Sequence, residues 1–435
     1  MWNKKLSASA ISFVFLRLMI ILYNLSIFLM RAGLRLAALF HPKAKSFVTG
    51  RKGLLQKIQA DYATNTAPVV WVHCASLGEF EQGRPVIEGL RKVFPKIRIV
   101  LTFFSPSGYD VRKHYQGADH VYYLPWDTAA NAKRFVKAIK PTLAIFVKYE
   151  FWHHYTQALA ANRTTILSIS SIFRPDQLFF KPYGGFYRKI LKRISHFFVQ
   201  NDESLKLLKA IGLNHCTRSG DTRFDRVYQI VKQAEELPTI QNFKNHQKIF
   251  VVGSSWSEDI DVLIPLINEN RMKFIIAPHE ISEQNLISLE RALQVKSIRY
   301  SQTTNINLED FQVLIIDNVG MLSKLYRYGE FAFIGGAYGK GLHNILEAAC
   351  YGVPIFFGNK NYTKFKEAVD LINRGGAFDV ADYTDLKMKY EMVTLPESFL
   401  LACEVTRQYV EENLGATEKI LTYCEATLRA KNTAA

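Results

Sequence analysis

The sequence lacks any sign of a disulfide framework or a zinc site. Its cysteines form no C-x-x-C motif and are scattered over the chain, at Cys74, Cys216, Cys350, Cys403 and Cys424. This pattern indicates reduced thiols in a cytoplasmic setting rather than a disulfide-linked secreted scaffold. No His/Cys cluster has the spacing of zinc ligands. Low-complexity tracts and solenoid repeats are also missing, so the 435 residues predict two ordinary globular domains.

Acidic residues are missing from the first sixty positions. This segment holds ten Lys or Arg residues and no Asp or Glu before Asp61. The charges flank an apolar run, residues 11–30, which has about the twenty residues needed to cross a bilayer. Arg17 and Asn24 interrupt the run, and an Arg at mid-bilayer costs about 2.5–3.5 kcal/mol. A tilted span, a helix lying in the membrane interface and a buried helix of a soluble protein are the three alternatives.

The distribution of basic residues predicts the side of the membrane. Two of them precede the apolar run and seven follow it, which places the rest of the chain in the cytoplasm. The basic collar also suits anionic lipid headgroups. Nucleic acid is the rival explanation for the net charge of +16, but no basic and aromatic recognition module accompanies it. We therefore expect residues 1–45 to form a membrane anchor with a basic collar.

Short apolar runs alternate with helix-like stretches after the anchor. The helix-like stretches have apolar residues at three- and four-residue spacing. The expected strands of the first series are 69–73, 97–103, 120–124, 142–147, 165–168 and 196–199, and those of a second series are "IFVVGSS", "FIIAP", "VLIID", "FAFIGG" and "VPIFFG". This alternation predicts parallel sheets that are covered by helices on both faces.

A polar segment without strand signals, residues 227–248, separates the two series. We interpret it as a hinge between a domain at 46–230 and a second domain at 231–435. Two doubly wound, Rossmann-like domains would face a cleft, with ligands at the carboxyl ends of the strands.

The second half carries a glycine-rich segment, residues 331–358, in which a strand runs into a loop and then into a helix. We expect the first turn of that helix to hold His343, Asn344 and Glu347. Glycines let backbone N–H groups approach an anion, and a helix N-terminus adds partial positive charge. The segment fits neither the Walker loop nor the G-x-G-x-x-G fingerprint. Glu347 could accept hydrogen bonds from ribose hydroxyls, and the alternative is a glycine turn that only packs.

Other polar strand ends are expected at the same edge of the second sheet. Ser254 and Ser255 lie at a helix start, where a capping box is the alternative interpretation. His279 follows another expected strand, and Gly320 with Met321 follows a third. Asp259-Ile-Asp261 resembles the D-x-D motif of metal-using sugar transferases. Acids in the early turns of a helix also favour its dipole, so we expect no metal there.

Glu79 is the most distinctive carboxylate of the first half. An apolar run, residues 67–72, is followed by a turn of small residues and then directly by this acid. A carboxylate at a strand-to-helix turn either complements the helix dipole or accepts a proton. Glu81 is the competing candidate, and its position two residues later puts it on a different side of a helix.

Several motifs occur together in one order along the chain. They are "GEF" after "HCAS", "KYEFW" (148–152), "GDTRFD" (220–225), "GSSW", "DNVGML" and "GGAYGKGLHNILEA". In these motifs the chain resembles the 3-deoxy-D-manno-octulosonic acid (Kdo) transferases, which add Kdo from CMP-Kdo to a lipid A precursor. The resemblance covers essentially the whole chain. It implies an α/β fold of GT-B type with an N-terminal membrane-anchoring helix, inverting transfer, and no metal or other cofactor.

The resemblance also implies roles for individual residues. Glu79 falls at the position of the general base, and the CMP-contacting positions fall on Pro278, His279, Val319, Gly320, Met321, Asn344, Ile345, Leu346 and Glu347. The chain departs from the family pattern at three places. "PR" is replaced by Pro278-His279, which makes the phosphate contact there weaker or pH-dependent. "MGE" is replaced by residues 319–321, which removes a carboxylate, and "GNLK" by "GDTR" at 220–223.

The implied function is Kdo transfer to the lipid A precursor lipid IVA, at the cytoplasmic face of the cell inner membrane. The expected partners are CMP-Kdo, the lipid A precursor and anionic membrane lipids, and nucleic acid is not expected. The fold alone also permits another GT-B nucleotide-sugar enzyme, either a UDP-sugar transferase or an epimerase. A membrane-tethered nucleotide-binding module without catalysis is a further alternative.

Overall fold

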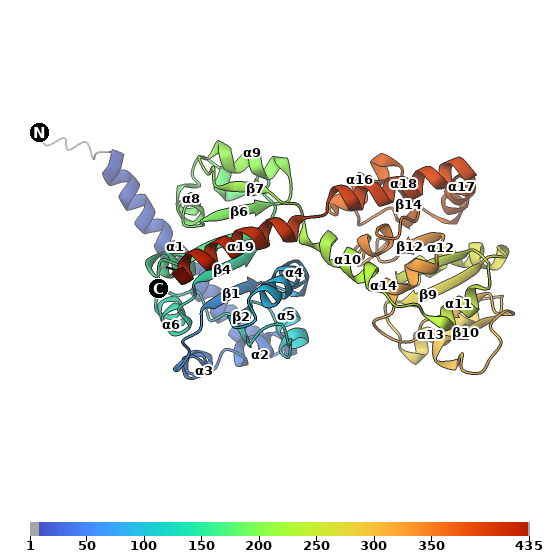
Figure 1. Cartoon of the computed structure of the whole chain (residues 1–435), viewed down its shortest axis with the longest axis horizontal. Helices are drawn as coiled ribbons and strands as arrows, with labels where there is room; N and C mark the ends of the chain where they lie inside the picture. The colour runs from blue at the N-terminus through green and yellow to red at the C-terminus, as the bar shows by residue number, and fades with distance from the viewer. Residues whose placement is uncertain (1–7, 434–435) are drawn as a thin grey trace, which may run out of the picture. The chain divides into compact units, whose positions relative to one another are not determined.

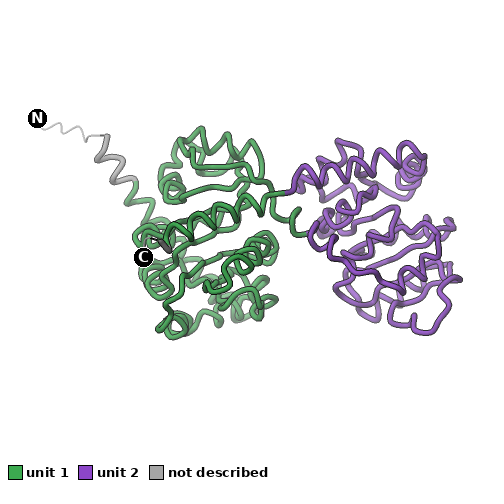
Figure 2. The backbone as a smooth tube through the Cα atoms, in the orientation of Figure 1, with its two compact units in different colours: residues 1–226, 415–435 green, residues 227–414 purple. Residues whose placement is uncertain are grey.

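The computed structural model describes residues 8–433, with side chains from residue 16 to residue 431. The chain divides into two compact units (Figure 2). Unit 1 comprises residues 1–226 and 415–435, and unit 2 comprises residues 227–414. Each unit contains one seven-stranded parallel sheet, as the alternation of strand and helix patterns predicts.

Unit 1 is built around a sheet in the order β3-β2-β1-β4-β5-β6-β7. Its strands are β1 (Val69–Cys74), β2 (Arg98–Phe103), β3 (His120–Tyr123), β4 (Leu143–Val147), β5 (Thr165–Ser171), β6 (His196–Val199) and β7 (Cys216–Arg218). The two central strands, β1 and β4, are buried along their whole length, because helices cover both faces of the sheet (Figure 1). The polar strand β7 lies at the edge of the sheet, and the sequence pattern did not predict it.

The helices of unit 1 form two layers, each with its own apolar core. One core packs residues of α3 (Leu54–Asp61), α6 (Ala129–Ile139), α7 (His153–Ala161) and α9 (Asp202–Ala210) against Trp71 and Phe146. The other packs α4 (Leu77–Val93) and α19 (Ala416–Thr433) against the opposite face. The remaining helical segments are α2 (Pro42–Thr49), α5 (Pro106–Arg112), η1 (Leu178–Phe180) and α8 (Gly185–Leu191).

The last helix, α19, returns to unit 1 after unit 2 is complete. Ile420, Cys424 and Leu428 on this helix are buried in the core around α4. The carboxylate of Asp225 accepts the N–H groups of Gly415 at 2.7 Å and Thr417 at 2.6 Å, which fixes the start of the helix. We expected residues 231–435 to form one domain, and the placement of α19 differs from that expectation.

Unit 2 contains a sheet in the order β10-β11-β9-β8-β12-β13-β14. Its strands are β8 (Ile249–Ser255), β9 (Lys273–Pro278), β10 (Ser297–Arg299), β11 (Val313–Ile315), β12 (Phe331–Ile334), β13 (Ile355–Gly358) and β14 (Ala377–Val380). Its helices are α11 (Pro238–Lys244), α12 (Ser257–Glu269), α13 (Glu283–Ala292), η2 (Tyr300–Gln302), α14 (Leu322–Leu325), η3 (Tyr326–Tyr328), α15 (Leu346–Ala349), α16 (Lys366–Arg374), α17 (Tyr383–Thr394) and α18 (Pro396–Glu412). The segment that we interpreted as a hinge is largely helical, since it holds the end of α10 (Thr222–Lys232) and all of α11.

The N-terminal apolar run forms the long helix α1 (Ala8–Ala37), and residues 16–37 are long and apolar enough to cross a membrane. One side of α1 contacts the rest of unit 1. The hydroxyl of Tyr23 donates to the buried carboxylate of Asp127 at 2.5 Å, and Asn24 Oδ1 lies 2.7 Å from His154 Nε2. The second contact explains why Asn24 stands inside the apolar run.

The opposite side of α1 is apolar and exposed. Its exposed residues are Leu18, Ile21, Leu22, Leu25, Phe28, Leu29 and Leu36. Of the described residues of α1, only Ile27 is buried, so the helix is not the buried core helix of a soluble protein. Lys4 and Lys5 lie outside the described residues.

Candidate active site

Glu79 lies where the central strand β1 turns into helix α4. Ser76 is the N-cap residue of α4, and its backbone N–H donates to Glu79 Oε2 at 2.9 Å. Together they form a capping box, which satisfies backbone donors that a helix start would otherwise leave free. The side chain is 9% exposed. The capping role that we weighed as an alternative is therefore present in the structure, and a second role has to be argued from the electrostatics.

Burial and a second carboxylate raise the pKa of Glu79. Burial has the largest effect, because it disfavours the charged form, and the negative charge of Glu150 acts in the same direction. Lys148, His73 and a backbone hydrogen bond at Ala75 oppose the shift. The effect of burial is larger than that of the backbone hydrogen bond. A raised pKa makes the carboxylate a stronger base once it has lost its proton.

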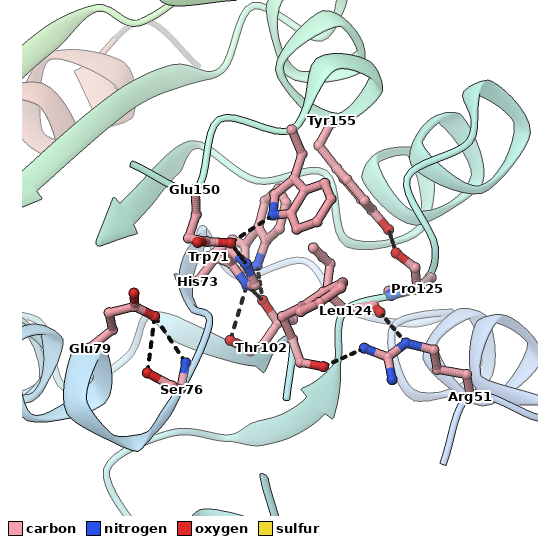
Figure 3. A network of polar contacts seen from close by, with 12 residues as sticks. Arg51, Trp71, His73, Ser76, Glu79, Thr102, Leu124, Pro125, Glu150 and Tyr155 are labelled. Atoms are coloured by element: carbon pink, nitrogen blue, oxygen red, sulfur yellow. Dashed lines mark hydrogen bonds and ion pairs between the residues drawn. The ribbon is translucent and has the colours of Figure 1, made fainter. Parts of the chain in front are cut away.

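Glu150 follows β4, the strand next to β1, and comes to the same edge of the sheet as Glu79 (Figure 3). Its Oε2 accepts from Trp152 Nε1 at 3.1 Å and lies 3.7 Å from His73 Nε2. The other ring nitrogen of His73 lies 2.8 Å from the buried hydroxyl of Thr102. We did not predict this second carboxylate. Its signal in the sequence is an acid at the end of a buried strand, in "KYEFW", whose neighbour in the sheet only the topology defines.

The competing acid, Glu81, is paired with arginines. Its Oε1 accepts from Arg112 Nη2 at 3.0 Å, and its Oε2 lies 4.0 Å from Arg84 Nη1. Both carboxylate oxygens of Glu81 therefore face a guanidinium group. The geometry thus favours Glu79 over Glu81 as the group that accepts a proton.

A second group of polar residues lies at the carboxyl edge of the sheet in unit 2. Pro278 ends β9, and the ring of His279 stacks between Trp256 and His343 with centroid distances of 4.5 Å and 4.6 Å. Trp256 Nε1 also donates to His343 Nε2 at 3.1 Å. Burial, followed by the neighbouring His279, lowers the pKa of His343, so this ring is neutral at neutral pH. The fold therefore brings the expected residue His279 together with the glycine-rich segment.

The glycine-rich loop after β12 is held against the end of β8. A Cβ atom on Gly335 would lie 2.4 Å from the carbonyl oxygen of Ser254, so only glycine fits there. Gly336 has a φ of +94°, in the left-handed region that glycine favours. Its N–H and that of Trp256 both donate to Asp259 Oδ2 at 2.8 Å. This carboxylate therefore ties the loop to the start of α12.

The expected helix after the loop is shorter than predicted. The single turn α15 begins at Leu346, so His343 and Asn344 precede it rather than lying in its first turn. Ile345 and Leu346 are buried, and Asn344 Nδ2 donates to Glu347 Oε1 at 3.0 Å. This segment can therefore bind a ligand through its backbone donors and through the Asn344–Glu347 pair. It has no long helix whose dipole could contribute.

The D-x-D motif separates into one buried and one exposed acid. Burial raises the pKa of Asp259 to about 6, whereas Asp261 is exposed. Within the described part of the chain, no group of three or more His, Cys, Asp and Glu residues could hold a metal ion. Ser255 Oγ and Asp259 Oδ1 are buried there without a hydrogen-bond partner. Unpaired buried polar atoms are costly unless a ligand or water satisfies them, so they mark this strand end as a candidate binding site.

The third expected segment, residues 319–321, connects β11 to α14. Because β11 pairs with β9 in parallel, the segment leaves the sheet at the same edge as Pro278. Val319 is 87% exposed, and Gly320 has a φ of +102°. The segment forms an open backbone surface beside His279, without the direct side-chain contact that joins His279 to His343.

The chain is similar in sequence to known transferases. Residues 48–226 match the family model described as 3-deoxy-D-manno-octulosonic-acid transferase (kdotransferase). A 3-deoxy-D-manno-octulosonic acid transferase from Rickettsia felis is 26% identical over 378 residues, which cover 84% of this chain and 80% of that protein. The protein of the same name from Aquifex aeolicus is 25% identical over 336 residues, which cover 75% of this chain and 86% of that protein.

Solved structures show the fold. UDP-GlcNAc 2-epimerase from Neisseria meningitidis, bound to UDP-GlcNAc, aligns with a TM-score of 0.57 at 14% identity and covers 83% of this chain and 100% of that chain. MurG from Acinetobacter baumannii aligns with a TM-score of 0.54 at 10% identity, over 83% and 99% of the two chains. Together with the two parallel seven-stranded sheets, these likenesses confirm the predicted α/β fold of GT-B type.

Proposed function

We propose that this chain, which is similar over most of its length to the 3-deoxy-D-manno-octulosonic acid transferases, transfers Kdo from CMP-Kdo to a hydroxyl group of the lipid A precursor lipid IVA. The observation that carries this proposal is the buried Glu79, whose pKa is raised by burial and by Glu150. The GT-B fold alone fits many sugar-nucleotide reactions. A buried carboxylate with a raised pKa adds the general base that transfer to a hydroxyl group needs.

The proposed reaction is a single displacement with inversion. The hydroxyl oxygen of the acceptor attacks the anomeric carbon of Kdo while Glu79 takes its proton. The bond from that carbon to the phosphate oxygen of CMP breaks at the same time, and CMP leaves with the bonding electrons. Glu79 then returns its proton to solvent, and the product carries one new glycosidic bond.

We propose that CMP binds at the carboxyl edge of the sheet in unit 2. The backbone N–H groups of the glycine-rich loop and Lys340, whose Nζ lies 5.7 Å from the centre of the Trp256 ring, provide positive charge for the phosphate. Asn344 and Glu347 provide an amide and a carboxylate for the ribose hydroxyls. CMP has a single phosphate, so these groups can receive the leaving charge without a cation.

The direct test is a product analysis. The purified full-length protein is incubated with CMP-Kdo and tetraacyl lipid A precursor, and the lipid product is analysed by mass spectrometry. We expect the acceptor mass to rise by one Kdo residue or more. In parallel, thermal protection by CMP is compared with protection by UDP. An unchanged acceptor mass together with protection by UDP alone would support a UDP-sugar enzyme instead, as the structural relative bound to UDP-GlcNAc suggests.

Glu347→Ala should weaken CMP binding by about 1–3 kcal/mol, because a ligand hydroxyl would lose a charged hydrogen-bond partner. Asn344→Ala should weaken it in the same direction, since its amide holds the Glu347 carboxylate at 3.0 Å. Isothermal titration with CMP measures both effects, and thermal unfolding checks that the variants are folded. Wild-type affinity in both folded variants would show that the nucleotide binds elsewhere.

Glu150→Gln should move the acid limb of the pH–rate profile to lower pH. The negative charge of Glu150 raises the pKa of Glu79, and Glu79 must be deprotonated to act as a base. The neutral glutamine removes this repulsion, so Glu79 loses its proton at lower pH. The measurement is the midpoint of kcat/KM against pH, which is independent of the maximum rate. An unmoved midpoint would show that Glu79 and Glu150 are not coupled.

We also propose that α1 lies in the interface of the inner membrane, on the cytoplasmic face. One side of the helix contacts unit 1 through Tyr23 and Asn24, and the other side is apolar and exposed. An interfacial helix needs this division into a protein-facing side and a lipid-facing side. A span through the bilayer would separate Tyr23 from Asp127.

The double variant Leu22→Glu/Leu25→Glu should therefore shift the protein from the membrane fraction to the soluble fraction, because two charges enter the apolar side of α1. Both residues are exposed in the structure, so folding should be retained. The matched control is Met388→Glu/Met392→Glu, which adds the same charges to exposed apolar positions on α17. Quantitative fractionation in moderate salt measures the shift. Equal release in both variants would assign membrane binding to a general charge effect.

A further inference from the structure

A groove of about 550 Å³ lies between helices α6 and α7 of unit 1. Its floor is formed by small and apolar side chains, among them Val136, Ala158 and Ala161. Its rim carries three exposed lysines, Lys133 and Lys137 on α6 and Lys140 at its C-cap. None of the described residues that line the groove is acidic. The groove is therefore apolar inside and cationic along one side.

The three lysines are not used within unit 1. Lys133 and Lys137 are four residues apart, so they project from the same side of α6, and Lys140 follows as the C-cap residue of this helix. In the described part of the chain, no carboxylate lies within ion-pairing distance of them, although ion pairs are common elsewhere on unit 1. Three cations over an uncharged floor attract an anion and leave room for apolar groups beneath it.

The groove is continuous with the docking site of α1. His154 lines the groove, and its Nε2 lies 2.7 Å from Asn24 Oδ1 on α1. The protein-facing side of α1 therefore borders the groove. An exposed apolar surface as large as that of α1 marks an interaction site. An occupant of the groove has to combine an anionic head with apolar chains and has to be available where α1 inserts.

We infer that this groove, the α6–α7 groove, binds one anionic phospholipid, with the phosphate on Lys133, Lys137 and Lys140 and an acyl chain along Val136 and Ala158. The inference goes beyond the transfer of Kdo, because the groove contains none of the residues assigned to donor binding or proton transfer. It adds a specific lipid site to the general attraction of a basic surface for anionic membranes.

The test is native mass spectrometry of the full-length protein in detergent, titrated with phosphatidylglycerol. We expect a one-to-one adduct that is weaker with phosphatidylcholine, whose headgroup has no net charge. Lys133→Gln/Lys137→Gln should lower the affinity for phosphatidylglycerol about 25-fold, since each lysine near an anionic lipid contributes about fivefold. The matched control is Lys206→Gln/Lys209→Gln, two exposed lysines of α9 in the same unit, which should leave the affinity unchanged.

Two further arms separate the possible sources of the signal. Ala161→Glu places a carboxylate at an exposed position of the groove and should also abolish the adduct. Glycerol phosphate at millimolar concentration should not displace the lipid, because it lacks the acyl chains. Displacement by glycerol phosphate would overturn the lipid assignment in favour of a phosphate site, and equal losses in the α6 and α9 variants would overturn the site itself. The readout is lipid binding, so it is independent of transferase activity.

Discussion

Glu79→Gln should lower turnover by about 10²–10⁴-fold, the usual contribution of general base catalysis. Glutamine is nearly isosteric with glutamate and can still accept the N–H of Ser76, so the capping box and the start of α4 should persist. It cannot accept the proton of the acceptor hydroxyl. The measurement is kcat with CMP-Kdo and the lipid A precursor, together with CMP affinity and the thermal midpoint, both of which should change little.

Glu81→Gln is the control for this variant, because Glu81 is paired with Arg112 and Arg84 and should not take part in proton transfer. It should keep most of the activity. Full activity in Glu79→Gln and its loss in Glu81→Gln would transfer the role of the base to Glu81. Full activity in both variants would leave Glu79 with only its capping role, and the substrate or solvent would supply the base.

Asp259→Ala should both destabilise unit 2 and weaken CMP binding at least tenfold. The substitution leaves the N–H groups of Trp256 and Gly336 without their acceptor, and each unpaired buried donor costs about 1–3 kcal/mol. The glycine-rich loop would then lose its tie to the start of α12. Thermal unfolding and CMP titration measure the two effects. Asp261→Ala, at an exposed position of the same helix, is the matched control and should behave like the wild type.

Asp259→Asn should distinguish the role of the acceptor from the role of the charge. The amide oxygen keeps an acceptor for the loop, so CMP binding should be largely retained. Burial raises the pKa of Asp259 to about 6 in the folded protein, above its ordinary value. Folding therefore becomes less favourable as the pH rises from the pKa of Asp259 in the unfolded chain towards about 6. The reason is that Asp259 loses its proton more easily in the unfolded chain than in the folded protein. The Asn variant should lack this loss of stability, and the opposite slope would contradict the assignment.

The alternation of strand and helix was visible in the sequence because most strands of both sheets are buried. Central strands such as β1 and β4 are continuous apolar runs, apart from His73 in β1, and such runs identify strands that are buried on both faces. The strands that were missed, β7, β10 and β14, are three or four residues long and contain polar residues. A short edge strand forms because a neighbouring strand donates and accepts hydrogen bonds along it. The residues of the edge strand itself do not show which strand that neighbour is.

The position of α19 is another feature that the local sequence pattern could not predict. Its apolar residues predict a helix with one buried face, but they do not state which core buries it. The apolar core around α4, and the carboxylate of Asp225 at the start of the helix, hold it in unit 1. The pairing partner is almost two hundred residues away in the chain, so only the tertiary structure could assign it.

The sequence by itself predicted the fold class, the resemblance to the Kdo transferases and Glu79 as a candidate base, because these depend on local pattern and on motifs read in order. The tertiary structure decided which residues act together. It brings Glu150 near Glu79 through adjacent strands and stacks His279 between Trp256 and His343. It also places the Asp259 carboxylate where it accepts the N–H of Gly336 in the glycine-rich loop. Electrostatic coupling and ring stacking depend on distances through space, and only the folded chain fixes those distances.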